Sequence, residues 1–419
     1  MPKGDTSMTV EKDNFLSAKI IAAPETNISQ QGSEKAAATH PNRHLSIDFY
    51  RGLVVTFMIL VNSPGSVQYA YAPLQHAKWF GCTLADVVFP SFLFIVGVAS
   101  WFSFAKYNRQ WSASVGYKIL KRVLLIFIVG LLLNKFPVFW KDLDHWRVMG
   151  VLQRIALSYG LAAVLVLTLS WRALIPATIG ILLLYWGLLN WFVMPGGDPY
   201  GQNTNAMFVL DRWIYGVEID AAEGIDQFLF GEQHHFRGHG FHFDSEGLLG
   251  TLPSVATVIL GWLSASLLSR FDARKDVLLR SLLALGVFCG FVGLAWGMVF
   301  PISKKLWTSS YVLYAGGISI ILLAACVWLI DVRKWRKGVT FFLVFGANPL
   351  FVFVLSEGIL QTLWYIQTSE GNAQDWLFNH SFRHIDNGKF GSLLFAMSFT
   401  FCCWLVCRWL YVRRIFIKL

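Results

Sequence analysis

A single histidine and a single carboxylate lie between two strongly apolar stretches of this sequence. In "YAPLQHAKWFGCTLADVVFP", residues 71–90, His76 precedes Asp86 by ten positions. Imidazole can take up a proton near neutral pH or carry an acyl group transiently, and a nearby carboxylate orients the ring and raises its basicity. From these residues alone, proton or acyl transfer and substrate binding by a transporter are equally open.

The composition predicts the element type that positions this pair. Of 419 residues, 55% are hydrophobic and 14% are charged, whereas soluble domains carry about 25% charged residues. Runs of about 20 apolar residues are long enough to cross a bilayer as helices. We therefore expect an all-α integral membrane protein with about ten transmembrane helices, near residues 48–64, 84–105, 116–134, 148–170, 172–193, 248–269, 276–300, 309–331, 339–362 and 390–412.

The distribution of Lys and Arg predicts how these helices are oriented. Connections on one side hold eighteen Lys and Arg residues and those on the other side hold ten, although the second set includes far longer loops. The positive-inside rule then makes both termini cytoplasmic and turns residues 63–83, 194–247 and 363–389 outward. This asymmetry also explains the net charge of +10 without a nucleic-acid partner. Residues 1–43 are expected to be a polar, disordered cytoplasmic tail, and residues 44–419 the transmembrane domain.

The longest outward loop is rich in histidine, with His234, His235, His239 and His242 inside "GEQHHFRGHGFHFDSEGLLG". This spacing would allow a zinc site. No Cys or Asp completes an obvious tetrahedral set, so we favour a polar lid over a pocket and expect no metal.

Three ionisable residues fall inside expected spans: Asp86, Arg154 and Glu357. A charge near the bilayer centre costs about 2.5–3.5 kcal/mol on insertion scales, so such residues usually face a cavity or each other. For Arg154, a pair that only joins helices and a functional role are equally compatible with the sequence.

Six segments together resemble the heparan-α-glucosaminide N-acetyltransferase family. They occur in the family's order over about 320 residues and are "RHLSIDFYRGLVVTFMILVN", "HAKWFGCTLADVVFPSFLFIVGVA", "VLQRIALSY", "FDSEGLLGTLPSVATVILGWLSA", "PISKKLWTSSYVLYAGGIS" and "GANPLFVFVLSEGI". The chain is most similar to bacterial members, which lack the lumenal domain of the animal enzyme. This implies a multi-pass protein of the bacterial inner membrane, and it makes a homodimer plausible.

The resemblance implies a transmembrane acetyltransferase. Such enzymes take acetyl from cytosolic acetyl-CoA and deliver it to the amino group of a glucosamine on the far side of the membrane. By matching motif positions, the catalytic residues are His76, Asn62 and Asp86. Asp48 and Arg51 match the cytoplasmic entrance, where the polyanionic end of CoA favours basic residues such as Lys121 and Arg122. The remaining motif positions are Arg154, assigned to the cofactor, and Asp244, Glu246, Lys304, Asn348 and Glu357, assigned to the acceptor substrate.

The implied chemistry agrees with the residue types. Acetyl transfer from a thioester to an amine needs a deprotonated nucleophile and stabilisation of the tetrahedral oxyanion. His76 would be the base or the acetyl carrier, Asn62 an oxyanion donor, and Asp86 the group that orients the imidazole. Two alternatives stay open: an amino-sugar transporter, and an acyltransferase that acts on another envelope glycan.

Overall fold

The computed structural model describes residues 44–139, 147–193, 197–201, 205–206, 245–369 and 371–417. Three of the expectations above lie outside these residues: the polar tail 1–43, the histidine-rich segment 234–242 and the substrate assignment of Asp244.

Each of the ten apolar stretches forms helix within a few residues of its expected bounds. The long helices are α2 (Leu45–Asn62), α3 (Leu84–Phe104), α4 (Ala113–Lys135), α5 (Val151–Thr168), α6 (Trp171–Trp191), α9 (Thr251–Arg270), α10 (Lys275–Trp296), α11 (Ser309–Val327), α13 (Pro349–Tyr365) and α15 (Lys389–Val412). Shorter elements are α12 (Val339–Ala347), α14 (Ala373–Ser381), the π-helix η5 (Trp328–Val332), the 3-10 turns η1 (Val67–Tyr69), η2 (Ala72–Leu74), η3 (Ala105–Tyr107) and η6 (Asp386–Gly388), and the strands β1 (Gln367–Thr368) and β2 (Gly371–Asn372).

Among the described residues, eight helices are long and apolar enough to cross a membrane, or nine if the bent pair α12–α13 is one span. The third expected span, α4, is a continuous helix that is not among these; it carries Lys118, Lys121, Arg122 and Lys135. The all-α, multi-pass fold class is thereby confirmed. The cytoplasmic location of both termini stays a prediction.

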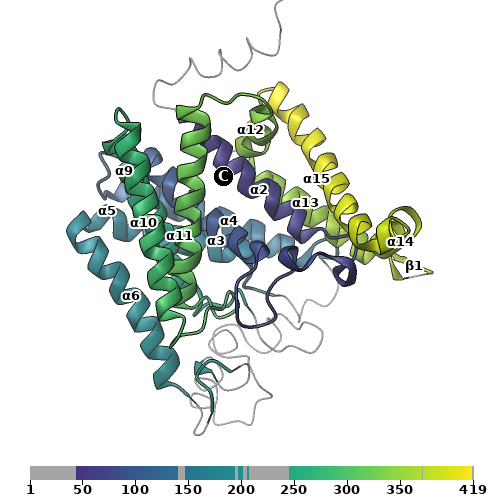
Figure 1. Cartoon of the computed structure of the whole chain (residues 1–419), viewed down its shortest axis with the longest axis horizontal. Helices are drawn as coiled ribbons and strands as arrows, with labels where there is room; N and C mark the ends of the chain where they lie inside the picture. Colours follow the sequence, from purple (N-terminus) through teal and green to yellow (C-terminus); the bar gives the residue numbers. More distant parts are fainter. Residues whose placement is uncertain are drawn as a thin grey trace, which may run out of the picture. The chain divides into compact units, whose positions relative to one another are not determined.

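The buried helix α3 carries Asp86 near its first turn and packs against α9 and α2 (Figure 1). Its contact with α9 is a close approach of two backbones. A Cβ built on Gly97 would lie 1.9 Å from the carbonyl oxygen of Val258, and one on Gly261 would lie 1.9 Å from that of Phe94. Only glycine permits this separation, a common device where membrane helices meet.

The ninth expected span is broken into α12 and α13, which meet at an angle of 85°. The break falls at Asn348, whose φ of −133° and ψ of 54° are not helical. Proline disfavours the helical conformation in the residue before it and suits the first position of a helix. Pro349 therefore ends α12 and begins α13, and the sequence prediction of one continuous helix here was wrong.

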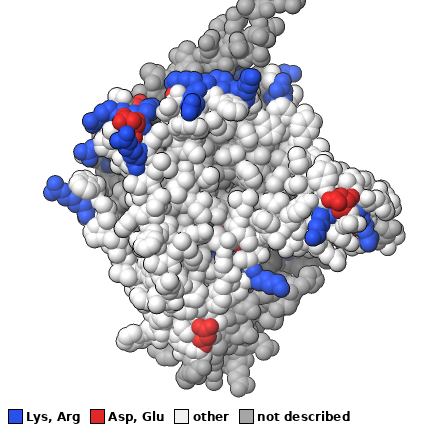
Figure 2. Space-filling model, in the orientation of Figure 1, with Lys and Arg blue, Asp and Glu red and all other residues white. Residues whose placement is uncertain are grey.

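Hydrogen bonds connect helix ends to one another at each of the two ends of the bundle. At one end, Ser46 at the start of α2 donates to Asp331 in η5 at 2.6 Å, and Asn348 donates to the carbonyl of Ile415 at 3.0 Å. At the other end, Tyr311 at the start of α11 donates to the carbonyl of Asp86 at 2.6 Å. Figure 2 shows Lys and Arg gathered along one edge of the view, whereas the broad middle of that face carries few charges.

The segment after α2 is fixed to the loop before α11. The amide of Gly81 donates to the carbonyl of Ile302 at 2.7 Å, and the hydroxyl of Ser303 donates to the carbonyl of Trp79 at 2.7 Å. Gly81 and Ser303 form an isolated parallel bridge. Residues 76–83 and 301–308 thus lie side by side over the beginning of α3.

Candidate functional site

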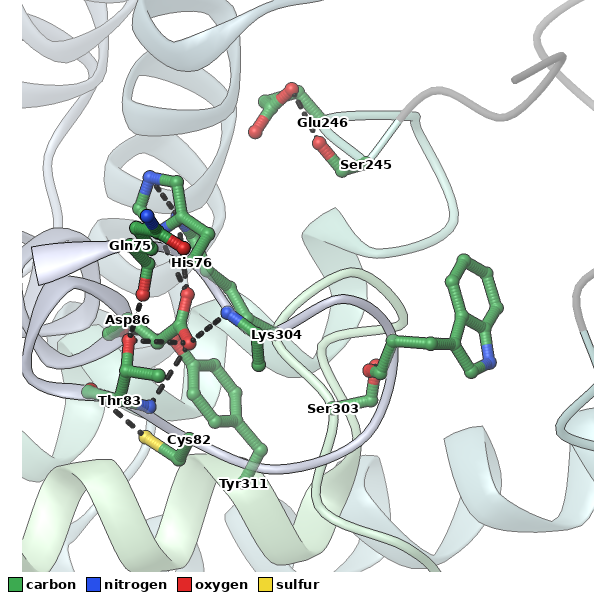
Figure 3. Close-up of polar contacts among 12 residues, drawn as sticks. Gln75, His76, Cys82, Thr83, Asp86, Ser245, Glu246, Ser303, Lys304 and Tyr311 are labelled. Carbon is green, nitrogen blue, oxygen red and sulfur yellow. Dashed lines mark hydrogen bonds and ion pairs between the residues drawn. The ribbon is translucent and has the colours of Figure 1, made fainter. Parts of the chain in front are cut away.

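Asp86 occupies the third position of α3 and is the centre of the polar cluster in Figure 3. One carboxylate oxygen, Oδ2, accepts from the amides of Ala77 and Thr83 and from the Thr83 hydroxyl, each at 3.0 Å. The Thr83 and Asp86 contacts form a capping box, which satisfies backbone donors at a helix start. The side chain is 1% exposed, so it is held by several donors in one orientation.

The second carboxylate oxygen of Asp86 is directed to His76. The distance from His76 Nδ1 to Asp86 Oδ1 is 2.8 Å, and the His76 side chain is 44% exposed. An ionised carboxylate only accepts, so Nδ1 carries the proton in this contact and Nε2 has the lone pair of a neutral ring. The pairing expected from the sequence therefore exists, and Nε2 is the ring nitrogen that does not contact Asp86.

Lys304 is the third member of this cluster. Its Nζ lies 3.2 Å from His76 Nδ1, 3.4 Å from His76 Nε2 and 3.8 Å from Asp86 Oδ1. Burial lowers the pKa of the Lys304 amine below its usual range, and the carboxylates of Glu246 and Asp86 oppose this shift. The structure thus brings together residues assigned separately to catalysis and to the acceptor.

Glu246 forms an ion pair beside this cluster, with Arg147 Nη2 at 2.9 Å from Glu246 Oε2. Burial raises the pKa of the Glu246 carboxyl, but Arg147, Arg154 and Lys304 outweigh burial and lower it to about 2. Figure 3 shows Glu246 with Ser245 set apart from the ring of His76. Glu246 is therefore an anion at neutral pH, coupled to Lys304 through space.

Arg154 lies near Glu246 and the cluster around Asp86, although the sequence assigned it to the cofactor. It is 1% exposed, donates to the carbonyl of Gly247 at 2.9 Å and lies 5.0 Å from the ring centre of Trp307. These contacts join the beginning of α5 to the loops before α9 and α11.

Cys82 lies close to Asp86, but its thiol is not in the reactive thiolate form. Burial raises the pKa of its thiol to about 12, and the charge of Asp86 adds to this shift. A thiol with so high a pKa is protonated at neutral pH and is a poor nucleophile. The basic groups that remain around Asp86 are the imidazole of His76, which is 44% exposed, and the amine of Lys304, which is 17% exposed.

Asn62 and Glu357 form a separate pair. The Asn62 amide at the end of α2 donates to the Glu357 carboxylate on α13 at 3.0 Å. Of the contacts within the described chain, none joins Asn62 to His76. The assignment of Asn62 as an oxyanion donor therefore stays a prediction.

The remaining assigned residues bond to or lie against groups other than His76 and Asp86. Arg51 donates to Asp48 Oδ1 at 2.5 Å and to the carbonyl of Gly346 at 2.7 Å. The Asn348 side chain bonds to the carbonyl of Ile415 and the amide of Ile417. Lys121 and Arg122 are exposed on α4, and the Arg122 guanidinium lies 4.9 Å from the ring centre of Tyr159.

Sequence reasoning missed several residues that build this site. Thr83 had a usable signal, because Thr followed three positions later by Asp is a capping-box pattern. Tyr311 and Arg147 had none, since their partners lie 225 and 99 positions away in the chain. Within the described residues, no group of three or more His, Cys, Asp or Glu could hold a metal ion.

Comparison with known proteins agrees with the motifs. Residues 43–207 match a family model described as heparan-alpha-glucosaminide N-acetyltransferase, catalytic. The resemblance is confirmed. The human heparan-alpha-glucosaminide N-acetyltransferase is 29% identical over 384 residues, which cover 80% of this chain and 56% of that protein. The mouse protein of the same name is 27% identical over 394 residues, which cover 83% of this chain and 58% of that protein. The chain spans about half the length of these curated relatives.

The region matched by the heparan-alpha-glucosaminide N-acetyltransferase model contains His76 and Asp86, together with Asn62 and Arg154. Lys304, Glu246 and Glu357 lie beyond residue 207. The cluster around Asp86 therefore joins the matched catalytic region to the loop that precedes α11.

Proposed function

We propose that this protein is a transmembrane acetyltransferase that moves acetyl from cytosolic acetyl-CoA to the amino group of a glucosamine-type sugar at the periplasmic face of a bacterial inner membrane. The observation that carries the proposal is the contact of 2.8 Å between His76 Nδ1 and Asp86 Oδ1, with the imidazole 44% exposed. The names of the human and mouse relatives support this choice of reaction.

This pair can supply the proton transfer that the reaction needs. With Nδ1–H donated to Asp86, the Nε2 lone pair is free to remove a proton from the acceptor amine. The amine nitrogen then bonds to the acetyl carbonyl carbon, the carbon–sulfur bond breaks, and CoA leaves as the thiolate. Alternatively, Nε2 itself takes the acetyl group and passes it to the amine in a second step. Both routes use the same nitrogen of His76.

The donor and the acceptor approach from opposite sides. The nucleotide end of acetyl-CoA is polyanionic and binds at the basic end of the bundle, near Arg51, Lys121 and Arg122. The amino sugar lies at the outward end, where Glu246 and Lys304 contact it. Acetyl-CoA is a co-substrate that leaves as CoA.

The direct test is purified protein incubated with acetyl-CoA and glucosamine. We expect free CoA and N-acetylglucosamine in equal amounts by mass spectrometry, and their loss in His76→Ala. The matched control is His384→Ala, which removes an exposed histidine of the last outward loop. Glucose offers a hydroxyl in place of the amine and should react several orders of magnitude more slowly. Equal CoA release with and without an amino sugar would refute the proposed acceptor class, and equal products from wild type and His76→Ala would refute the site.

A second candidate is a transporter of amino sugars. The observation that favours it is the span broken at Asn348, because broken helices often form transporter substrate sites. This candidate predicts uptake of labelled glucosamine into vesicles that contain no acetyl-CoA. The acetyltransferase predicts no uptake under those conditions.

A further inference from the structure

Lys304 is held beside His76 by backbone contacts and not by its own charge alone. The two residues before it are fixed: Ile302 accepts from the Gly81 amide, and Ser303 donates to the carbonyl of Trp79. The Lys304 side chain is 17% exposed. Its amine therefore has a defined place relative to the imidazole.

That place is above the face of the ring. The two ring nitrogens flank Cε1, so an atom at 3.2 and 3.4 Å from them in the ring plane would collide with Cε1. Nζ consequently lies out of the plane and cannot form an aligned hydrogen bond to either lone pair. The Nε2 lone pair stays in the plane, on the open side of the ring.

A lysine that served only to neutralise Asp86 would lie closest to the carboxylate. Here Nζ is nearer to both ring nitrogens than to Asp86 Oδ1, which is 3.8 Å away. The carboxylate already accepts from Ala77 and Thr83 through Oδ2 and from His76 through Oδ1. The position of the amine is thus explained better by an action on the imidazole.

The sign of this action follows from Coulomb's law. An ammonium over the ring disfavours the imidazolium and favours the neutral imidazole, whereas Asp86 has the opposite effect. Among the described residues, the ionisable groups near the ring include Asp86 on α3, Cys82 in the segment before it, and Lys304 in the loop before α11. Glu246 and Arg154 act on the Lys304 amine: the carboxylate raises its pKa and the guanidinium lowers it.

We propose that Lys304 is a positioning residue that keeps the His76 imidazole uncharged, so that Nε2 is available to the substrate. This inference rests on the proposed acetyl transfer, because it assigns a role within that reaction. The carboxylates of Glu246 and Asp86 favour the ammonium form of Lys304. Lys304 has no part in bond making; it sets the charge of the group that does.

The kinetic test is the pH dependence of kcat/KM for acetyl transfer in wild type, Lys304→Met and Lys304→Arg. The acid limb is the low-pH part of this profile, where the rate falls because the catalytic base becomes protonated. Removing the neighbouring positive charge should move this limb to higher pH by about one unit in Lys304→Met. Lys304→Arg keeps the charge and should keep the wild-type limb. A Lys304→Met profile that is lower but unshifted would overturn the proposal, because a structural role lowers the rate without moving the limb.

A second measurement does not need activity. The imidazole of His76 can be followed by NMR in detergent, with His76→Gln used to assign its signal. We expect its titration midpoint to rise by about one pH unit in Lys304→Met and to stay in place in Lys304→Arg. No shift in Lys304→Met would overturn the proposal. If wild-type protein released no CoA but this midpoint moved, the proposed reaction would fail while the electrostatic role of Lys304 stood.

Discussion

Both ends of the helix bundle pair a carboxylate with a basic side chain close to the start of a helix. At α3, Asp86 accepts from His76, and at α2, Asp48 accepts from Arg51. The two pairs differ in the surroundings of the basic side chain. Arg51 also donates to the carbonyl of Gly346, whereas the His76 side chain stays 44% exposed.

This difference separates a site for chemistry from a joint between helices. Arginine stays charged at all accessible pH values and has no lone pair to offer, so the Asp48–Arg51 pair can bind an anion or join α2 to α12 but cannot move a proton. Histidine can exchange a proton near neutral pH. Both pairs lie in motifs that the sequence shows equally clearly. Only the pair of Asp86 and His76 contains a side chain that can exchange a proton near neutral pH.

The largest expected effect is that of His76→Ala. General base or nucleophilic catalysis contributes about 10²–10⁴-fold, so kcat for acetyl transfer should fall by that factor. Binding of acetyl-CoA and the melting temperature should change little, because the imidazole is 44% exposed. Calorimetric titration with CoA and thermal unfolding in detergent check both. Near-normal turnover would remove His76 from the mechanism.

Asp86→Asn is expected to lower kcat by about 10²-fold, since an amide presents a donor where Nδ1–H needs an acceptor. The matched control is Thr83→Ala, which removes one capping partner but leaves the contact between Asp86 and His76. This control should cost about 0.5–2 kcal/mol of stability with a small change in rate. If both variants lost rate equally, Asp86 would act only as a helix cap.

Glu246→Gln tests the ion pair beside the site through its pH dependence. A carboxylate whose pKa is lowered from 4.5 to about 2 stabilises the fold above pH 4.5 and loses this effect as the pH falls toward 2. The variant should be about 1.5–3 kcal/mol less stable at pH 7. The difference from wild type should shrink between pH 4.5 and 2 in thermal unfolding. A difference that persisted at pH 2 would assign the loss to packing.

Arg51→Lys has the smallest expected effect. Lysine retains the charge but loses the planar donor to the Gly346 carbonyl, at a cost of about 0.5–1.5 kcal/mol. kcat should be unchanged, and KM for acetyl-CoA should rise a few-fold if Arg51 binds the nucleotide. A fall in kcat as large as that of Asp86→Asn would erase the contrast between the two ends.

The sequence predicted the helices well because membrane spans obey a simple rule of length and polarity. It missed the break in the ninth span, although Asn348 followed by Pro349 is a turn signal. It predicted the pairing of His76 with Asp86, which are ten residues apart. It placed Lys304 only on a motif, because the contact of residues 76–83 with 301–308 depends on backbone pairing across more than 200 residues.

The most direct test of the central claim uses oriented vesicles that contain either wild-type protein or His76→Ala. Acetyl-CoA is supplied on the face that carries the basic helix ends, and glucosamine on the opposite face. We predict N-acetylglucosamine on the glucosamine side with wild-type protein, none with His76→Ala, and CoA retained on the donor side. Glucosamine that crossed the membrane without acetyl-CoA, or product formed equally by both proteins, would contradict an acetyltransferase centred on His76.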